Sequence, residues 1–268
     1  TDKDGNLIYL YSNNLEEQYS YIDAAKNKGY NVLLMDGQLD VAMVSMLEHK
    51  LEKCRFTRVD SDVIDRLIAK DEPKGEELAN EKKDILSSVF RSQLPNMNKV
   101  EFNVETRAMG ETGTPIMITQ SEYMRRMKEM SHIQAGMSFY GEMPDMFNVV
   151  LNSDHKLVKQ VLEDANSACR EELLPIETSI AALNFEQSEM QKKQQGMKYD
   201  EIPQADKDAL SEIEKKIADE KSKKDAVLGK YAGENKVIRQ LVDLALLQNN
   251  MLKGEALTNF VKRSIEMI

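Results

Sequence analysis

Few residues in this chain have the type and spacing that catalysis or metal binding requires. The three histidines, His49, His132 and His155, lie far apart, and polar or charged residues surround each of them. A histidine can act as a base or a metal ligand, but these three are more simply surface or capping residues. No CxxC, HExxH, GxSxG or phosphate-loop motif occurs. The sequence therefore predicts no catalytic, cofactor-binding or metal-binding residues in this segment, which we do not expect to be an enzyme.

The segment SNNLEE, residues 12–17, stands where a dinucleotide-binding sheet would carry a glycine-rich turn. It has no glycine, and its two glutamates would face the place that a phosphate occupies, so nucleotide binding is disfavoured. Asp36 and Asp40 flank the end of a predicted strand, where carboxylates more often cap helices than catalyse. An enzyme with a degenerate dinucleotide-binding domain stays an alternative, and it would need a ligand near Ser12 and Asp36.

The composition narrows the class of protein. The 268 residues are 41% hydrophobic and 31% charged with a net charge of −10, which describes a folded, polar chain and disfavours nucleic acid as a partner. No apolar run could span a membrane and no export leader is visible, so we expect a cytoplasmic protein without a membrane partner. Cys54 and Cys169 are then expected to be free thiols. Because the chain begins at Thr1 and soon enters an apolar run, we expect a piece of a longer protein.

Methionine is concentrated in one part of the chain. Eight of the 16 methionines lie between Met109 and Met146. The flexible thioether suits both irregular cores and surfaces that accept varied partners, and residue type alone favours the core. In the helix predicted from Ser121 onward, three apolar side chains fall within an arc of about 60°, at about 100° per residue. These are Tyr123, Met127 and Met130, with Met124 at the edge of the arc and Arg125, Arg126, Lys128 and Glu129 outside it.

Residues 7–68 alternate between strand and helix patterns. Short apolar runs predict buried strands, and the amphipathic segments between them predict helices. The strands are expected at 7–11, 31–35 and 54–59. This order implies a small parallel sheet with helices packed on it, in three α/β/α layers over residues 1–70. The polar segment 71–84, which contains Pro73 and Gly75, predicts a linker.

The remaining residues, 85–268, have the patterns of a mixed domain with a second small sheet. Its strands are expected at 99–105, 116–118 and 146–152. Asn152 is expected to cap the helix that follows. Two heptad-like stripes around one break predict an antiparallel helical hairpin over 175–232. Two short amphipathic helices, 235–252 and 255–267, complete the expected α+β arrangement.

Four segments together resemble the bacterial members of the heat-shock protein 90 chaperone family. They are YIDAAKNKGYNVLLMD, RFTRVDSDVID, TPIMITQSEYMRRM and VLNSDHKLVK. The resemblance covers nearly the whole chain in order and implies the end of that family's middle segment followed by its C-terminal dimerisation domain. It departs from the family pattern over 175–232, which therefore looks like an inserted hairpin. The family's ATP and magnesium site lies in an N-terminal domain and its catalytic arginine earlier in the middle segment, so neither is expected in this chain.

The resemblance also implies two partners, which are non-native client proteins and a second copy of the chain. It reverses the preference for a core role of the methionines and implies that their helix faces clients. The expected client-binding residues are Tyr123, Met124, Met127, Met130, Met137 and Phe139. The last two helices of each copy would form a dimeric four-helix bundle through Ile238, Leu241, Val242, Ala245, Leu257, Phe260, Val261 and Ile265. The alternative is a homodimeric coiled-coil scaffold with a non-catalytic α/β interaction domain.

Overall fold

The computed structural model describes residues 1–37, 39–69, 77–131, 138–196 and 202–267. The chain divides into two compact units. The sheet unit comprises Thr1–Ala79, Leu94–Val158 and Gln240–Ile268, and the helical unit comprises Asn80–Gln93 and Lys159–Arg239. The two units group residues by tertiary contact and not by chain order, so they differ from the division at 70 and 85 expected from the sequence, which stays a prediction.

The first sheet of the sheet unit confirms the predicted parallel topology. Its strands β1 (Leu7–Ser12), β2 (Val32–Leu34) and β3 (Cys54–Arg58) run in the order β2-β1-β3. The expectation of a buried second strand was wrong, because Leu33 and Leu34 are exposed. β2 lies at an edge of the sheet, and of its three residues only Val32 packs against a core cluster.

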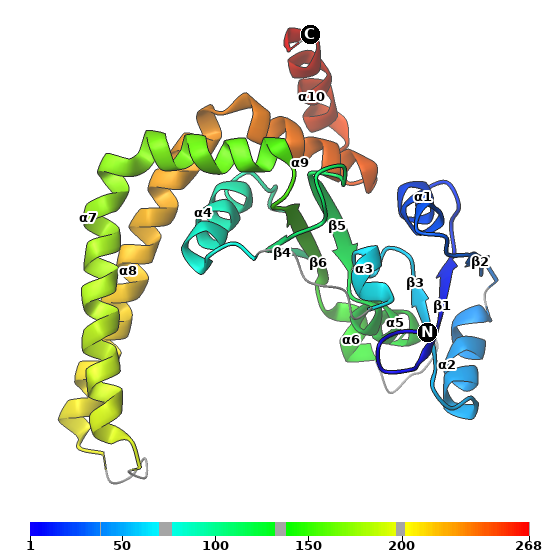
Figure 1. The fold of residues 1–268 in the computed structure, drawn as a ribbon, viewed down its shortest axis with the longest axis horizontal. Coiled ribbons are helices and arrows are strands. Elements are labelled where there is room, and N and C mark those ends of the chain that lie inside the picture. The colour runs from blue at the N-terminus through cyan, green and yellow to red at the C-terminus, as the bar shows by residue number, and fades with distance from the viewer. Residues whose placement is uncertain (38, 70–76, 132–137, 197–201, 268) are drawn as a thin grey trace. The chain divides into compact units, whose positions relative to one another are not determined.

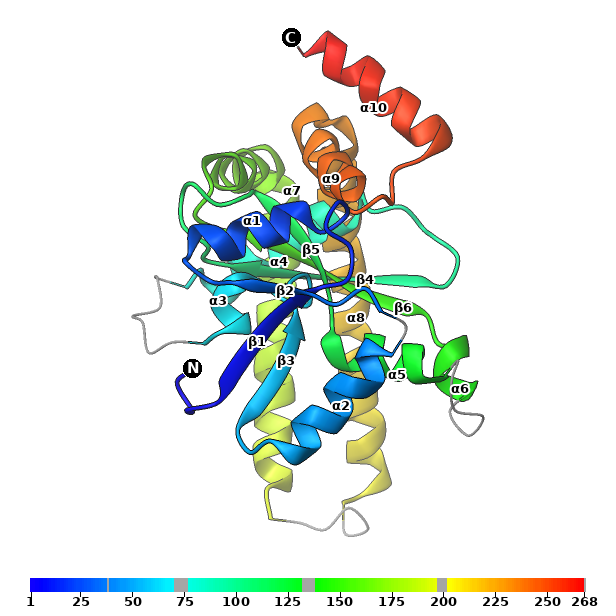
Figure 2. The same ribbon diagram turned by 90° about the vertical axis from the view of Figure 1, so that its right-hand side faces the viewer.

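Helices cover both faces of this sheet (Figure 2). They are α1 (Tyr19–Asn27), α2 (Asp40–Lys50) and the short α3 (Ile64–Leu67). Consecutive strand residues point to opposite faces, so Leu10 packs with α1 and α3 while Tyr11 packs with α2. The first cluster also holds Tyr21, Ile22, Ala25 and Leu67, and the second holds Met35, Val44 and Phe56.

The second sheet is mixed, because its central strand has one parallel and one antiparallel neighbour. Strands β4 (Val100–Arg107), β5 (Ile116–Gln120) and β6 (Asp145–Asn152) take the order β4-β6-β5, with β4 and β6 parallel and β5 and β6 antiparallel. The central strand β6 buries Val149, Val150 and Leu151. Helices α5 (Glu122–Ser131) and α6 (Ser138–Glu142) lie between β5 and β6 in the chain.

The prediction that Asn152 caps the next helix was wrong. That helix, α7 (Lys156–Gln194), begins later, and the ring nitrogen Nδ1 of His155 accepts a hydrogen bond from the Leu157 amide at 3.2 Å. The buried Asn152 side chain instead accepts from the Met109 amide at 3.1 Å and donates to the Gly110 carbonyl at 2.8 Å. Its role is to fasten the loop before β5 to the end of β6.

The helical unit is built from α4 (Asn80–Arg91), most of α7 and α8 (Gln204–Glu234). Helix α4 already starts at Asn80, so the last residues of the polar segment 71–84 are helical. Its first turn is polar, so the apolar periodicity becomes visible only from Ile85 onward. Residues 70–76 of that linker lie outside the described residues.

Helices α7 and α8 run side by side in opposite directions, which confirms the predicted antiparallel hairpin (Figures 1 and 2). Lys224 of α8 is paired with Glu177 of α7 at 2.8 Å, and Gln187 further along α7 donates to Glu214 earlier in α8 at 3.4 Å. Helix α7 is continuous through Pro175. The expected insertion over 175–232 therefore has no helix boundary at its start.

The end of α8 belongs to the core of the helical unit. Ser88 of α4 donates to Asp225 of α8 at 2.5 Å. Leu228 is fully buried, and an added Cβ at Gly229 would lie 3.4 Å from the Ser92 side chain. Val227 is half-buried, whereas its neighbour Leu228 faces inward. Only the distal part of the hairpin can be an accessory.

Shortening the hairpin tests whether its distal part can be removed while its base, which packs on α4, stays folded. Joining Leu183 to Ala218 by a short glycine-serine linker is expected to leave a soluble chain with native helical circular dichroism, because the base of α7 and the α8 residues that pack on α4 remain. Long surface insertions carry only a small loop-closure cost, so removing the distal part changes little else.

The matched deletion removes residues 175–232 entirely. It takes away the α8 residues that cover α4 and should give an aggregated product, because the buried face of α4 becomes exposed. Equal solubility and equal thermal midpoints for the two deletions would show that the base of α8 is dispensable.

The terminal helices α9 (Lys236–Gln248) and α10 (Gly254–Glu266) are joined by a polar cluster. Gln240 of α9 donates to Ser264 of α10 at 2.7 Å and accepts from the guanidinium of Arg263 at 2.9 Å. Arg263 also forms an ion pair with Asp243. Within the described residues, no helix is both long and apolar enough to cross a lipid bilayer.

Candidate functional site

The helix α5, which carries the methionine stripe, contacts the first sheet through a charged face. Its first residue, Glu122, accepts from the Tyr11 hydroxyl of β1 at 2.9 Å and from the Arg58 amide of β3 at 3.2 Å. The same carboxylate accepts from Arg125 at 2.8 Å and from Arg126 at 2.6 Å. One carboxylate therefore joins two strands to two arginines of its own helix.

Arg126 extends this contact to α2, the helix that packs with Tyr11. It forms an ion pair with Glu48 of α2 at 2.6 Å and donates to the Phe56 carbonyl of β3 at 2.5 Å. Glu48 in turn accepts from the Phe56 amide at 2.6 Å. We call Tyr11, Glu48, Glu122, Arg125 and Arg126 the Glu122 cluster.

The cluster is buried, which makes its charges interdependent. Arg125 is 5% exposed, lies 5.9 Å from the centre of the Tyr11 ring, and donates to the Tyr11 hydroxyl at 2.5 Å. Burial, and then the charge of Glu122, raises the pKa of Tyr11 to about 12, so the phenol stays protonated and can donate to Glu122. Burial raises the pKa of Glu122, but the charges of Arg125 and Arg126 outweigh it and hold that pKa below 4.5. Glu122 is thus kept as an anion.

The opposite side of α5 carries the expected client-binding residues. Tyr123 is 62% exposed, and Met124, Met127 and Met130 are each half-buried. Phe139, on α6, is 72% exposed. Met137 lies outside the described residues. The structure therefore brings the described side chains of the stripe onto the face of α5 away from the Glu122 cluster.

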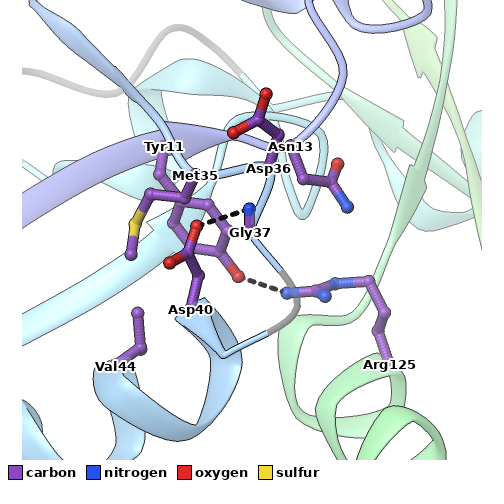
Figure 3. Close-up of a pocket in the computed structure, with 8 residues that line it drawn as sticks. All are labelled: Tyr11, Asn13, Met35, Asp36, Gly37, Asp40, Val44 and Arg125. Atoms are coloured by element: carbon purple, nitrogen blue, oxygen red, sulfur yellow. Dashed lines mark hydrogen bonds between the residues drawn. The ribbon is translucent and has the colours of Figure 1, made fainter.

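A cavity of about 130 Å³ lies at the carboxyl ends of β1 and β2. Figure 3 shows its lining, where Arg125 enters from α5 and reaches Tyr11. Asp40 accepts from the Gly37 amide at 2.8 Å, so it stabilises the turn before α2. Asn13 and Asp36 complete the polar lining. This is where the alternative enzyme would hold a ligand, and its two carboxylates make it unfavourable for a phosphate.

The expected dimer residues divide into two groups. Ile238, Leu241, Val242 and Ala245 of α9 are at most 5% exposed, so the chain itself covers them. Phe260 is 9% exposed and Leu257 is half-buried. Only Val261, at 46%, and Ile265, at 69%, are open to a partner. Leu244 and Leu247 of α9, which were not among the expected residues, are also exposed, at 46% and 37%.

Sequence reasoning missed the Glu122 cluster. It placed Arg125 and Arg126 outside the apolar arc without assigning them a contact. The available signal was the spacing of Glu122, Arg125, Arg126 and Glu129, because charges three and four residues apart on a helix are neighbours. Their partners Tyr11 and Glu48 lie far away in the chain, so spacing alone could not identify them.

Over its whole length the chain is similar to proteins named as chaperones. No protein-family model matches it. It is 66% identical over all 268 residues to the chaperone protein HtpG of Bacteroides fragilis and equally similar to that of Bacteroides thetaiotaomicron. It is 43% identical, again over 268 residues, to the chaperone protein HtpG of Porphyromonas gingivalis. In each case the match covers 100% of this chain and 39% of the relative.

Proposed function

Since the chain belongs to the HtpG chaperones of the heat-shock protein 90 family, we propose that it is the part of such a chaperone that holds non-native proteins and joins two copies. The observation that carries the client-binding part is the two-sided character of α5. One face is fixed to the first sheet by the Glu122 cluster, and the rest of the helix surface carries the exposed Tyr123 and three half-buried methionines. Methionine surfaces adapt to varied partners, as a client surface must.

Fixing the helix by its charged face has a direct consequence for binding. A helix held by apolar contacts would turn its methionines inward, whereas α5 has its buried Arg125 on the inner side. The stripe then stays accessible without the helix losing its anchor. A rigid helix also loses less conformational entropy when a client binds.

Replacing Met127 and Met130 together by serine is expected to weaken binding of an unfolded model protein about tenfold, because apolar contact area is lost. Binding should be measured by fluorescence anisotropy of a labelled, permanently unfolded protein. The matched control replaces Met43 and Met46, which are 41% and 48% exposed and belong to α2 and not to the stripe of α5, and should leave binding unchanged.

The thermal midpoint distinguishes a client surface from a core. A loss of about 2–5 kcal/mol per residue, as for truncated core side chains, would assign Met127 and Met130 to the interior and remove the proposal. Binding that is absent in the unmodified chain would instead favour the homodimeric scaffold, which predicts no affinity for unfolded proteins.

The chain spans 39% of its relatives, and we propose that ATP and magnesium bind the longer protein outside this segment. Calorimetry of the chain with ATP and magnesium is expected to show no saturable heat. The turn at 12–17 offers no glycine and two glutamates, where a phosphate needs backbone amides. The longer chaperone is the positive control, and micromolar binding by the segment alone would contradict this assignment.

A further inference from the structure

Three methionines of the sheet unit meet at one small cavity beside α5. Three methionines line a space of about 10 Å³: Met124 of α5, Met146 of β6, and Met143 in the connection between α6 and β6. Gln120, Lys128, Pro144 and Asp145 complete the lining. Met146 is 43% exposed, and Met124 and Met143 are half-buried. We call this set the methionine cavity. It lies on the β6 side of the helix, whereas the Glu122 cluster fixes the helix to the first sheet.

The rim of the methionine cavity holds the ion pair that ties α5 to β6. The ammonium of Lys128 on α5 lies 2.7 Å from the Asp145 carboxylate at the start of β6. The side-chain amide of Gln120 donates to the same carboxylate at 3.4 Å. The thioether sulfurs therefore border two hydrogen-bond donors that already share one acceptor.

A thioether that solvent can reach is open to oxidation by peroxides. The sulfur lone pair attacks one oxygen of hydrogen peroxide, the O–O bond breaks, and an S–O bond forms, so sulfur loses two electrons. The hydroxide that leaves takes up a proton and becomes water. The product is methionine sulfoxide, which is polar and which methionine sulfoxide reductases convert back to the thioether.

We propose that the methionine cavity is a site of reversible oxidation, and that sulfoxide formation there loosens α5 from β6. The three thioethers border a space of about 10 Å³, close to the size of one water, so one added oxygen would fill it and place a polar atom between α5 and the start of β6. The sulfoxide oxygen accepts hydrogen bonds, so it competes with Asp145 for Lys128 and Gln120. Both effects act on the contact that holds this side of the helix.

The exposed fraction of each methionine side chain predicts which other methionines hydrogen peroxide oxidises. Met43, Met46 and Met267 are also exposed, at 41%, 48% and 46%, so they should react as well. Met35 is 8% exposed and should be protected. Of these, Met43 and Met46 lie on α2, away from the Lys128–Asp145 pair, so their oxidation should leave the exchange of α5 unchanged.

The test treats the whole chain with hydrogen peroxide and follows it by mass spectrometry. Peptide mapping is expected to find sulfoxide at Met146 and then at Met124 or Met143. Hydrogen exchange of the amides of residues 122–131 should become about tenfold faster, which corresponds to about 1.4 kcal/mol of lost protection. Adding methionine sulfoxide reductases for both epimers should restore the original exchange.

Matched variants separate this site from general damage. The substitution of leucine at Met124, Met143 and Met146 keeps apolar volume and removes the reactive sulfur, so exchange of α5 should no longer respond to peroxide. Leucine at Met43 and Met46 should leave the response as in the unmodified chain. If the triple variant fails to fold, the single change Met146→Leu at the exposed position should still reduce the response.

The effect on client binding rests on the proposed function, whereas the exchange measurement does not. An unmodified chain that binds no unfolded protein would contradict the proposed function and leave the exchange test intact. Oxidation confined to Met43, Met46 and Met267, or an unchanged exchange of 122–131 despite sulfoxide at Met146, would overturn the inference. So would an equal response of the triple leucine variant.

Discussion

Replacing Glu122 by alanine is expected to destabilise the chain by about 3–5 kcal/mol, because this one carboxylate is the acceptor for four donors and each buried donor left without an acceptor costs about 1–3 kcal/mol. The carboxylate accepts from Tyr11, Arg125, Arg126 and the Arg58 amide. Arg125 would keep its ion pair with Glu129 and Arg126 its pair with Glu48. Tyr11 and the Arg58 amide would lose an acceptor in a buried place.

Urea unfolding measures this loss, and an exposed ion pair is its matched control. Glu212 and Lys216 of α8 are 2.8 Å apart with side chains 67% and 57% exposed. Glu212→Ala should leave the urea midpoint nearly unchanged, because exposed pairs contribute little. A change below about 1 kcal/mol for Glu122→Ala would mean that the cluster is electrostatically unimportant.

The pH dependence gives a second measurement of the same residue. The pKa of Glu122 is below its ordinary 4.5 in the folded chain, so the unfolded state binds the proton more tightly. The contribution of Glu122 to stability is therefore present above pH 4.5 and is lost as the pH falls through the lowered pKa. The stability difference between the unmodified chain and Glu122→Ala should shrink in that range and stay constant around pH 7.

Placing aspartate at both Val261 and Ile265 is expected to convert a dimer into a monomer, with a dissociation constant raised at least about a thousandfold. Burying a charge without a partner costs several kcal/mol, and each 1.4 kcal/mol is a factor of ten. Val261 and Ile265 are the expected interface residues that the chain leaves most exposed. With Leu244 and Leu247 they give α9 and α10 apolar surface that a second copy could cover through an isologous contact.

Sedimentation equilibrium at micromolar concentration measures the association, and two variants control for folding. Asn259→Asp adds a charge on another side of α10 and should leave the dimer intact. Phe260→Asp changes a residue that is 9% exposed, so it should destabilise the helix pair as well as association. A dimer that persists in the double aspartate variant would place the interface elsewhere, and an unmodified chain that is monomeric at tens of micromolar would refute the dimer.

The sequence by itself determined the elements whose patterns are local. The alternation of apolar runs and amphipathic segments over 7–68 predicted the parallel sheet, and the two stripes around one break predicted the antiparallel hairpin. The segments resembling the chaperone family also identified its relatives. Such patterns are readable because the side-chain periods of 2 and 3.6 residues follow from backbone geometry alone.

Only the tertiary structure decided which side of each element is covered. The sequence could not show that Leu33 and Leu34 lie on an edge strand, since strand order depends on how the connections cross. Nor could it show that Arg125 is buried, because the Tyr11 hydroxyl that receives its hydrogen bond lies 114 positions away in the chain. The same holds for α9, where Ile238 and Val242 are covered by the chain while Leu244 and Leu247 are exposed. Periodicity gives the angle between side chains on one element, whereas burial depends on the neighbours that the fold brings to each angle.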